Sequence, residues 1–337
     1  MKQLLKVTKY FICNRNCNFS SISNSQLCRS FMYAPGDKLK MINKLISPTN
    51  PDKPDISVFD LEDAVGVNSK DTARDNLISI VNSGVLKDKN TTTFCVRINS
   101  IKNKEWIEKD LDLIAKCLEI SSYESPQMIN LSKVESIEDL IWLDENLKKR
   151  INLTNLKHPI ELGMMIESCL GISRLNDTCE ALHRTNFSCF KMHHAVFGSD
   201  DFCSTLGVSR SPTNIEVLYA RQHFVTVVKA HNILPIDMVD IDFNNIEALE
   251  NNCRFGMSLG FVGKQVIHPK QLQTVNKLFS PPEEKIVWAA ELLKEYESQK
   301  DYKGAFSFRN NMIDMPTILQ AKHLVALNQM ILSKQKP

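Results

Sequence analysis

The chain has 337 residues, of which 43% are hydrophobic and 24% are charged, and its formal net charge is +2. This balance is typical of a globular protein, and it excludes the polybasic class of proteins that bind nucleic acid or membrane surfaces through their overall charge. The sequence has no run of about 18 apolar residues, so a helix that spans a membrane is not expected.

The first 29 residues differ in composition from the rest of the chain. They contain no Asp or Glu, and they are rich in Ser and Asn. Their basic residues are Lys2, Lys6, Lys9, Arg15 and Arg29. A basic leader without acids is typical of an organelle transit peptide. We therefore expect residues 1–29 to be a targeting segment, and the alternative is a tail without a targeting role.

From Ser30 onward, short apolar runs alternate with amphipathic stretches. The runs predict eight strands, which cover residues 30–34, 56–61, 93–98, 127–131, 160–166, 194–197, 236–239 and 263–267. Apolar residues recur with helical spacing between them. The longest predicted helices cover residues 70–81, 105–118, 137–147, 168–182 and 215–228.

Strands that alternate with helices predict a parallel sheet, and eight such units within residues 30–280 match a (β/α)8 TIM-type barrel. The alternative is an open, doubly wound sheet. Its dinucleotide-binding form carries a GxGxxG pattern after the first strand, and that pattern is missing here. Residues 281–337 exceed the barrel, and we expect them to form a C-terminal helical extension that carries Asp314.

Polar residues follow the predicted strands at the points where the strands end. The reacting groups of barrel enzymes lie at these carboxyl ends. The acids found there are Asp60, Glu62, Asp63, Glu167, Asp200, Asp201, Asp240 and Asp242, and the bases are Arg97, Lys133 and His268. We therefore expect a ring of acids with a few cations at one end of the barrel.

Glu167 and Asp201 are the predicted metal ligands. Each follows an apolar run, and both would reach one edge of the sheet if the two runs are neighbouring parallel strands. Mg²⁺ uses one or two carboxylates and leaves its other positions to water and substrate oxygens. The alternative is that each acid only caps the helix that follows it. Asp60, Glu62 and Asp63 are expected to support this site, by holding waters or by orienting Arg97 or Lys133.

Three cations have a possible role in substrate binding. Arg97 ends a predicted strand and can hold a carboxylate or a thioester oxygen through two parallel hydrogen bonds. Its alternative role is an ion pair within the ring of acids. Lys40 and Lys44 are four residues apart, so they share a helix face, where two ammonium groups suit phosphates. A solvated helix face explains this lysine pair equally well.

Seven stretches, taken in order, resemble the citrate lyase β-subunit-like family. They are Tyr33-x-Pro-Gly, Asp60-x-Glu62-Asp63, Val96-Arg97-Ile98-Asn99, Lys133-Val134-Glu135-Ser136, Ile166-Glu167-Ser168, Phe197-Gly198-Ser199-Asp200-Asp201-Phe202 and Gly263-Lys264-Gln265-Val266-Ile267-His268-Pro269. The resemblance runs from about Arg29 to the C-terminus and includes Met312-Ile313-Asp314-Met315-Pro316. It implies a (β/α)8 barrel that assembles as a homotrimer.

The resemblance also implies roles for individual residues. Glu167 and Asp201 would bind Mg²⁺, and Arg97 would contact the substrate. The CoA portion would be contacted by Tyr33, Lys40, Lys44, Ile267 and His268. Asp314 would be the catalytic carboxylate, supplied to the site of a neighbouring subunit. The family usually has Glu where this chain has Asp200, so the support around Asp201 is expected to differ.

The implied activity is Mg²⁺-dependent cleavage of (3S)-citramalyl-CoA to acetyl-CoA and pyruvate in the mitochondrion. In the condensing direction, an acyl-CoA and a small 2-oxo acid would give weak malate or methylmalate synthase activity. Two alternatives remain open on the sequence. One is a thioesterase for malyl-CoA-type substrates, and the other is a non-catalytic CoA-binding subunit. Asp314 also has an alternative reading, as part of an exposed loop with apolar anchors.

Overall fold

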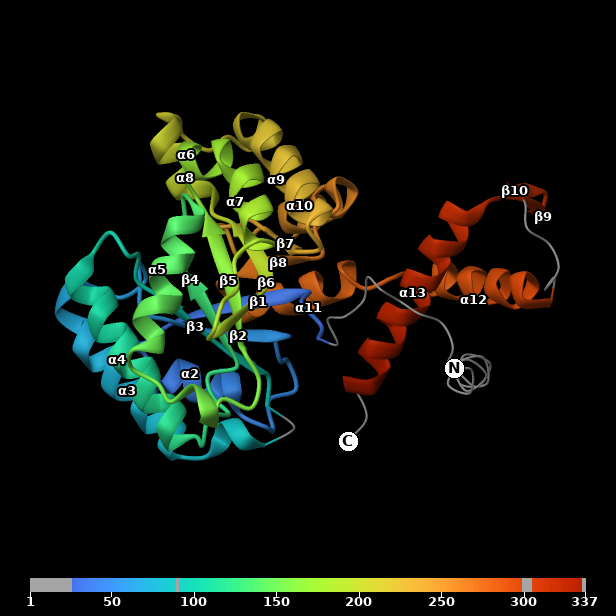
Figure 1. The fold of residues 1–337 in the computed structure, drawn as a ribbon. Coiled ribbons are helices and arrows are strands. Elements are labelled where there is room, and N and C mark those ends of the chain that lie inside the picture. The colour runs from blue at the N-terminus through green and yellow to red at the C-terminus, as the bar shows by residue number, and fades with distance from the viewer. Residues whose placement is uncertain (1–25, 89–90, 299–304, 335–337) are drawn as a thin grey trace. The chain divides into compact units, whose positions relative to one another are not determined.

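The computed structural model describes residues 26–88, 91–298 and 305–334. Within these ranges eight parallel strands close into a barrel, in chain order, with the eighth strand paired to the first (Figure 1). This confirms the predicted (β/α)8 barrel and excludes the open sheet. The predicted leader lies almost entirely outside the described residues. No helix in the described ranges is long and apolar enough to cross a membrane.

The barrel strands are short, and helices or helical turns follow them along the chain. The strands are β1 (Ser30–Pro35), β2 (Ile56–Asp60), β3 (Thr93–Ile98), β4 (Met128–Leu131), β5 (Ile160–Ile166), β6 (Phe190–Phe197), β7 (Leu234–Asp237) and β8 (Gly263–Val266). The helices are α2 (Leu39–Ile46), α3 (Lys70–Asn82), α4 (Lys104–Ile120), α5 (Ile137–Lys148), α6 (Cys169–Ser173), α7 (Leu175–Leu182), α8 (Ser199–Leu206), α9 (Leu218–Ala230), α10 (Ile246–Leu259) and α11 (Pro269–Leu278). Single turns of 3-10 helix are η1 (Val67–Ser69), η2 (Val85–Lys87), η3 (Leu153–Asn155) and η4 (Ile215–Val217).

Alternation along the strands builds two apolar layers. Successive side chains of a strand point to opposite faces, so every second residue lies inside the barrel. On β1, Phe31 and Tyr33 belong to the inner cluster, whereas Met32 and Ala34 pack in the cluster that the helices cover. The inner cluster also takes Ile56, Val58, Cys95, Met128, Met165, Val196 and Ile236. The strand interiors are therefore mostly apolar, with buried polar exceptions such as Asn130 on β4 and His194 on β6.

Most predicted boundaries are shifted by one or two residues, as for the seventh strand, which is Leu234–Asp237 rather than 236–239, and three elements differ for a visible reason. The sixth strand begins at Phe190 rather than at residue 194, because it pairs along the full length of β5 from Ile160 onward. The predicted helix 168–182 is divided into α6 and α7 at Arg174. The predicted helix 215–228 begins as the turn η4, which Asn214 precedes with a left-handed φ of 52°. In each case tertiary pairing or a local turn overrides the apolar periodicity.

The residues that follow Phe279 belong to a second compact unit. It contains α12 (Glu283–Ser298), the antiparallel strands β9 (Phe306–Phe308) and β10 (Asn311–Ile313), and α13 (Met315–Lys334). Arg309 and Asn310 turn the hairpin, both with positive φ. Such turns match the natural twist of two antiparallel strands. The unit has its own apolar cluster, which includes Ala289, Leu292, Leu293, Ile313, Ile318 and Ala321.

Candidate active site

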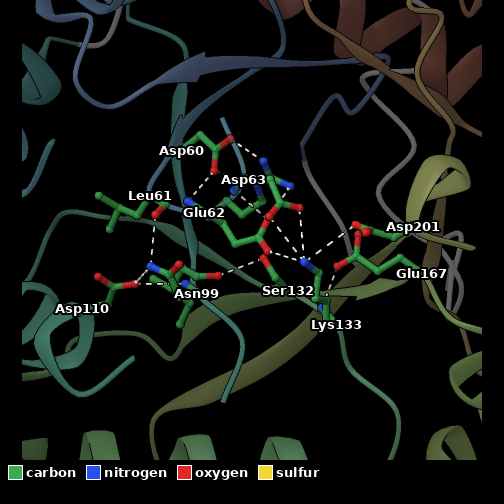
Figure 2. A network of polar contacts seen from close by, with 12 residues as sticks. Asp60, Leu61, Glu62, Asp63, Asn99, Asp110, Ser132, Lys133, Glu167 and Asp201 are labelled. Atoms are coloured by element: carbon green, nitrogen blue, oxygen red, sulfur yellow. Dashed lines mark hydrogen bonds and ion pairs between the residues drawn. The ribbon is translucent and has the colours of Figure 1, made fainter. Parts of the chain in front are cut away.

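Carboxylates from three neighbouring parts of the barrel rim meet around one lysine (Figure 2). Glu167 follows β5 directly and is 3% exposed. It lies against Gly198, the residue that follows β6, because a Cβ atom at position 198 would come within 2.6 Å of Glu167 Oε2. A side chain at position 198 would displace the Glu167 carboxylate, so glycine at this position leaves the space that the carboxylate occupies.

Asp201 lies in the first turn of α8, and its carboxylate lies beside that of Glu167 next to Lys133 (Figure 2). Burial, followed by repulsion from Glu62, raises the pKa of Glu167 to about 8. Burial also raises the pKa of Asp201. Two adjacent carboxyl groups that both resist ionisation favour a positive charge between them.

Neither acid caps the helix that follows it, so the capping alternative is wrong. The side chain of Ser168, not that of Glu167, accepts the hydrogen bond from Gly171 N at the start of α6. Helix α8 begins at Gly198 without a side-chain cap. Both carboxylates are therefore left for another partner.

Lys133 connects these acids to the end of β2. Its backbone has a positive φ of 57°, and its N–H donates to Glu167 Oε1 over 2.7 Å. Its ammonium group lies 2.9 Å from Glu62 Oε1 and 3.9 Å from Asp201 Oδ2. Burial alone would lower the pKa of Lys133, but the surrounding carboxylates raise it above its usual value. Lys133 therefore stays charged.

The residues present fit a small divalent cation. In the part of the chain that the structure describes, no three or more His, Cys, Asp or Glu residues are arranged as a complete metal cage. Mg²⁺ does not require one, because it is usually bound by one or two carboxylates together with waters. Glu167 and Asp201 are two such carboxylates beside Lys133, whose ammonium already lies among the acids. Glu167 and Asp201 are therefore the pair that could hold the ion.

Arg97 is held by the acids at the end of β2. It is the register partner of Asp60, so both side chains point into the barrel. Arg97 Nε donates to Asp60 Oδ1 over 2.7 Å, Nη2 donates to Asp60 Oδ2, and Nη1 lies 3.1 Å from Glu62 Oε2. The ion-pair alternative for Arg97 is thus present in the structure. A guanidinium has five N–H donors, so two remain for a ligand.

Tyr33 lies beneath Arg97. The Arg97 guanidinium carbon is 5.2 Å from the centre of the Tyr33 ring, and burial raises the pKa of the Tyr33 phenol. Tyr33 is 8% exposed, so only a small part of it is accessible to a ligand.

The structure describes no contact between the other predicted residues of the barrel and Glu167. Lys40 and Lys44 are exposed on α2. Ile267 is partly exposed after β8, and the Nδ1 atom of His268 accepts a hydrogen bond from Lys270 N at the start of α11. Asp200 is exposed and faces Arg210, with 3.4 Å between Oδ1 and Nη1.

Asp314 belongs to the second unit, where it immediately precedes α13. Its carboxylate is exposed. Asp314 Oδ1 accepts hydrogen bonds from Thr317 N over 3.3 Å and from Thr317 Oγ1 over 2.9 Å. This is the exposed setting that the loop alternative described, and it leaves Asp314 Oδ2 open to a partner.

Two buried residues behind the cluster, Lys70 and Asp110, escaped the sequence analysis. The ammonium of Lys70 contacts the backbone of Glu62, and Asp110 holds Asn99. Each shares a helix face with buried apolar residues: Lys70 lies three residues before Ala73, and Asp110 lies three residues after Ile107. This helical spacing could have identified both residues as buried, but it carries no information about the groups that they bind.

A pocket of about 700 Å³ adjoins the cluster. It is bordered by Glu62, Asp63 and Lys133 on one side and continues past Asn99 to Lys102 and Trp106. Glu62, Asp63 and Lys133 are therefore accessible to a molecule larger than water, while Glu167 and Asp201 do not line this pocket.

Comparisons with known proteins agree with this architecture. Residues 29–269 match the family model described as HpcH/HpaI aldolase/citrate lyase. The chain is 35% identical to the human protein named citramalyl-CoA lyase, mitochondrial, over 91% of this chain and 87% of that protein. It is 27% identical to the citrate lyase subunit beta of Escherichia coli K12, over 87% of this chain and 91% of that one.

Solved structures share the fold. A citrate lyase from Burkholderia xenovorans superposes with a TM-score of 0.73 at 18% identity, covering 91% of this chain and 93% of that one. The CitE protein of Mycobacterium tuberculosis, solved with magnesium, acetoacetate and coenzyme A, gives 0.65 at 22% identity and covers 89% and 98%. The chain belongs to the HpcH/HpaI aldolase/citrate lyase family, which confirms the resemblance and the expectation of a lyase.

Proposed function

We propose that this enzyme is a Mg²⁺-dependent carbon–carbon lyase that cleaves (3S)-citramalyl-CoA to acetyl-CoA and pyruvate. The observation that carries the proposal is the pair of carboxylates, Glu167 and Asp201, that Lys133 brings together near Arg97 at the barrel rim. The identity with human citramalyl-CoA lyase over nearly the full length of both chains supports the choice of substrate.

In this proposal Glu167 and Asp201 hold Mg²⁺. The bound ion would polarise the carboxylate and the tertiary hydroxyl of the substrate and lower the pKa of that hydroxyl. Lys133 keeps the Glu167 carboxylate in place through its backbone N–H. The ammonium of Lys133 also offsets part of the negative charge that the acids and the substrate bring together.

Arg97 receives the charge that develops when the bond breaks. As the hydroxyl gives its proton to solvent water and becomes the carbonyl of pyruvate, the electron pair of the carbon–carbon bond passes to the thioester fragment as an enolate. The two N–H groups of Arg97 that remain free can donate to the enolate oxygen. Donors fixed in advance at such an oxygen are among the strongest contributors to catalysis. Asp60 and Glu62 fix this guanidinium.

We assign the last proton transfer to Asp314. Its carboxyl group would protonate the enolate carbon and release acetyl-CoA, or take a proton from acetyl-CoA in the condensing direction. Its exposure at the start of α13 suits delivery to the site of a neighbouring subunit. The proposal therefore includes a homotrimer.

The CoA portion is assigned to the rim near β1 and β8. Lys40 and Lys44 are exposed one helical turn apart on α2 and are placed to bind phosphates. Tyr33, Ile267 and His268 would line the way from these lysines to Arg97. The leader at residues 1–29 and the mitochondrial relatives support a location in mitochondria. Condensation of acetyl-CoA with a 2-oxo acid would be a weak reverse activity.

The test is to mix the purified protein with citramalyl-CoA and Mg²⁺, with and without EDTA, and to follow pyruvate and free thiol together. We expect pyruvate without thiol, lost with EDTA and restored by added Mg²⁺. Thiol without pyruvate would replace the lyase with a thioesterase. Neither product, with CoA still bound, would make the chain a binding subunit.

A further inference from the structure

A buried ammonium group lies behind Glu62. Lys70 is the first residue of α3, and it is 4% exposed. Its Nζ donates to Leu61 O over 2.6 Å, to Glu62 O over 2.8 Å and to Asn99 Oδ1 over 3.0 Å. An ammonium has three donors, so Lys70 is fully used inside the protein.

Asn99 completes this arrangement from the end of β3. Its Nδ2 donates to Leu61 O over 3.0 Å and to Asp110 Oδ2 over 2.6 Å (Figure 2). Asp110 is fully buried on α4, and its other oxygen accepts from Arg74 Nε and Nη2. The chain of contacts is therefore anchored on two helices, α3 and α4.

These contacts leave no backbone group of Leu61 or Glu62 without a partner. Leu61 N donates to Arg97 O, and Glu62 N donates to Asp60 Oδ1. Both carbonyls accept from Lys70, and Glu62 O also accepts from Val65 N. Leu61 N still bonds to β3, but the carbonyls of Leu61 and Glu62 accept from side chains, so Lys70 and Asn99 supply bonds that a strand neighbour would otherwise give.

The side chain of Glu62 carries this constraint into the candidate site. Its carboxylate lies 3.1 Å from Arg97 Nη1 and 2.9 Å from Lys133 Nζ, and it is 4% exposed. A carboxylate between two cations can shift toward either of them unless its backbone is fixed. The position of Glu62 thus sets where the free donors of Arg97 and the ammonium of Lys133 point.

We propose that Lys70 and Asn99 are positioning residues for the reaction: they fix the Leu61–Glu62 backbone and, through Glu62, hold Arg97 and Lys133 in their reactive places. The kinetic part of this inference rests on the proposed function. The structural part, that the Leu61–Glu62 backbone depends on Lys70 and Asn99, does not rest on the proposed function.

The chain offers a matched control in a second buried lysine. Lys264 on β8 is fully buried, donates to Met238 O over 2.6 Å and lies 2.9 Å from Asp240 Oδ2. Like Lys70 it bonds a carbonyl just beyond the end of a strand. The described contacts of Lys264 do not lead to Arg97 or Lys133.

The experiment compares Lys70→Met, Asn99→Ala and Lys264→Met in the full-length protein with the wild type. Methionine keeps the length of the lysine side chain and removes its donors. The measurements are kcat and KM for citramalyl-CoA at saturating Mg²⁺, the melting temperature, and amide hydrogen exchange at Leu61, Glu62 and Val65. Removing partners that orient a reacting group typically lowers activity about 10–100-fold.

We expect Lys70→Met to lower kcat about 10–100-fold per folded molecule and to speed exchange at residues 61–65. Asn99→Ala keeps the bonds from Lys70, so it should have a smaller effect in the same direction and stay measurable even if Lys70→Met does not fold. Lys264→Met should lower the melting temperature and leave kcat within about twofold, with wild-type exchange at these amides.

Two results would overturn the proposal. One is that the folded variants at positions 70 and 99 keep wild-type kcat, or lose it only in proportion to the unfolded fraction. The other is unchanged exchange at residues 61–65. A wild type without lyase activity would defeat the proposed function instead, and the exchange comparison would then decide by itself whether Lys70 and Asn99 fix the segment.

Discussion

Two parts of the barrel rim are built from the same kinds of residue. Past β2, Lys70 bonds backbone carbonyls beside an Arg74–Asp110 ion pair. Past β7, Lys264 bonds Met238 O beside an Arg221–Asp237 ion pair. In both parts a buried lysine replaces strand neighbours, and a buried arginine and aspartate neutralise each other.

The difference is the balance of charge that each part presents. In the second part the carboxylates of Asp237 and Asp240 are matched by Arg221 and Lys264, and Asn252 donates to Asp240. At the rim near β2 to β6, six carboxylates face four cations: Asp60, Glu62, Asp63, Asp110, Glu167 and Asp201 against Lys70, Arg74, Arg97 and Lys133. Burial and pairing alone therefore do not mark a site. The unmatched negative charge does.

The sharpest way to test this contrast is Glu167→Gln, which removes one carboxylate from the unbalanced cluster. We expect lyase activity to be lost, because half of the proposed ligand pair is gone. We also expect the metal-free protein to melt at a higher temperature, because repulsion among the acids falls. Activity assays and calorimetry without Mg²⁺ check both. A variant that keeps its Mg²⁺-dependent turnover would remove Glu167 from the site.

Asp314→Asn tests whether the unbalanced cluster of the barrel catalyses the reaction without the carboxylate of the second unit. The amide has the shape of the acid but cannot transfer its proton, so kcat should fall about 10²–10⁴-fold. Binding of Mg²⁺ and CoA, measured by calorimetric titration, should be unchanged because the barrel residues are untouched. Full turnover in this variant would contradict the role given to Asp314.

Asp237→Asn likewise removes one carboxylate, but from the balanced part of the rim, where the expected effect is on stability. It leaves Arg221 and Lys264 buried with one carboxylate fewer, and breaking a buried ion pair costs about 3–5 kcal/mol of unfolding free energy. The fraction that stays folded should keep its kcat. Denaturant unfolding and specific activity separate the two effects. A fall in activity without a loss of stability would contradict the claim that this part of the rim is not a site.

Neutral buried groups provide the smallest test. Burial, with a smaller effect of Lys191, lowers the pKa of His193 to about 4, and burial lowers that of His194 further. The unfolded chain takes up these protons near pH 6.5, so stability should be lost as pH falls from about 6.5 to 4. His193 alone accounts for roughly 3 kcal/mol at 1.36 kcal/mol per pKa unit.

The variant His193→Asn checks this assignment by melting curves between pH 7.5 and 4. Its stability should depend less steeply on pH than that of the wild type. Glu161 Oε2 lies 3.7 Å from His193 Nε2 and would partly favour the protonated ring. The difference in pH dependence between wild type and variant therefore gives the net effect of burial and of Glu161 on His193. Equal slopes in the two proteins would assign the acid sensitivity elsewhere.

The sequence predicts the barrel and most of its strand ends well, because apolar runs and helical spacing are local signals. It also predicts that Glu167, Asp201 and Arg97 stand at one rim, since that follows from strand order. Contacts set by tertiary register are not local. The pairing of Asp60 with Arg97 depends on the β2–β3 register. The helical pattern places Lys70 on the apolar face of α3, but it does not predict the bonds of Lys70 to Leu61 O and Glu62 O.

Asp240 is a residue whose position the sequence predicts but whose partners it does not. Its place at a strand end is correct, but Lys264 and Asn252 satisfy it, so it adds nothing to the acid excess. Asp237 lies inside the predicted seventh strand, where a charge is unfavourable unless it is paired. Its partner Arg221 is 16 positions earlier on α9, a separation at which a single sequence gives no signal for a contact.

The contact between Gly198 and Glu167 has a consequence for the entropy of ion binding. One oxygen of Glu167 packs against the Gly198 backbone, and the other accepts the Lys133 N–H. The side chain has lost its freedom to change rotamer before any cation arrives. The conformational entropy of the Glu167 side chain is therefore lost when the protein folds, and a cation binds a carboxylate that is already immobile.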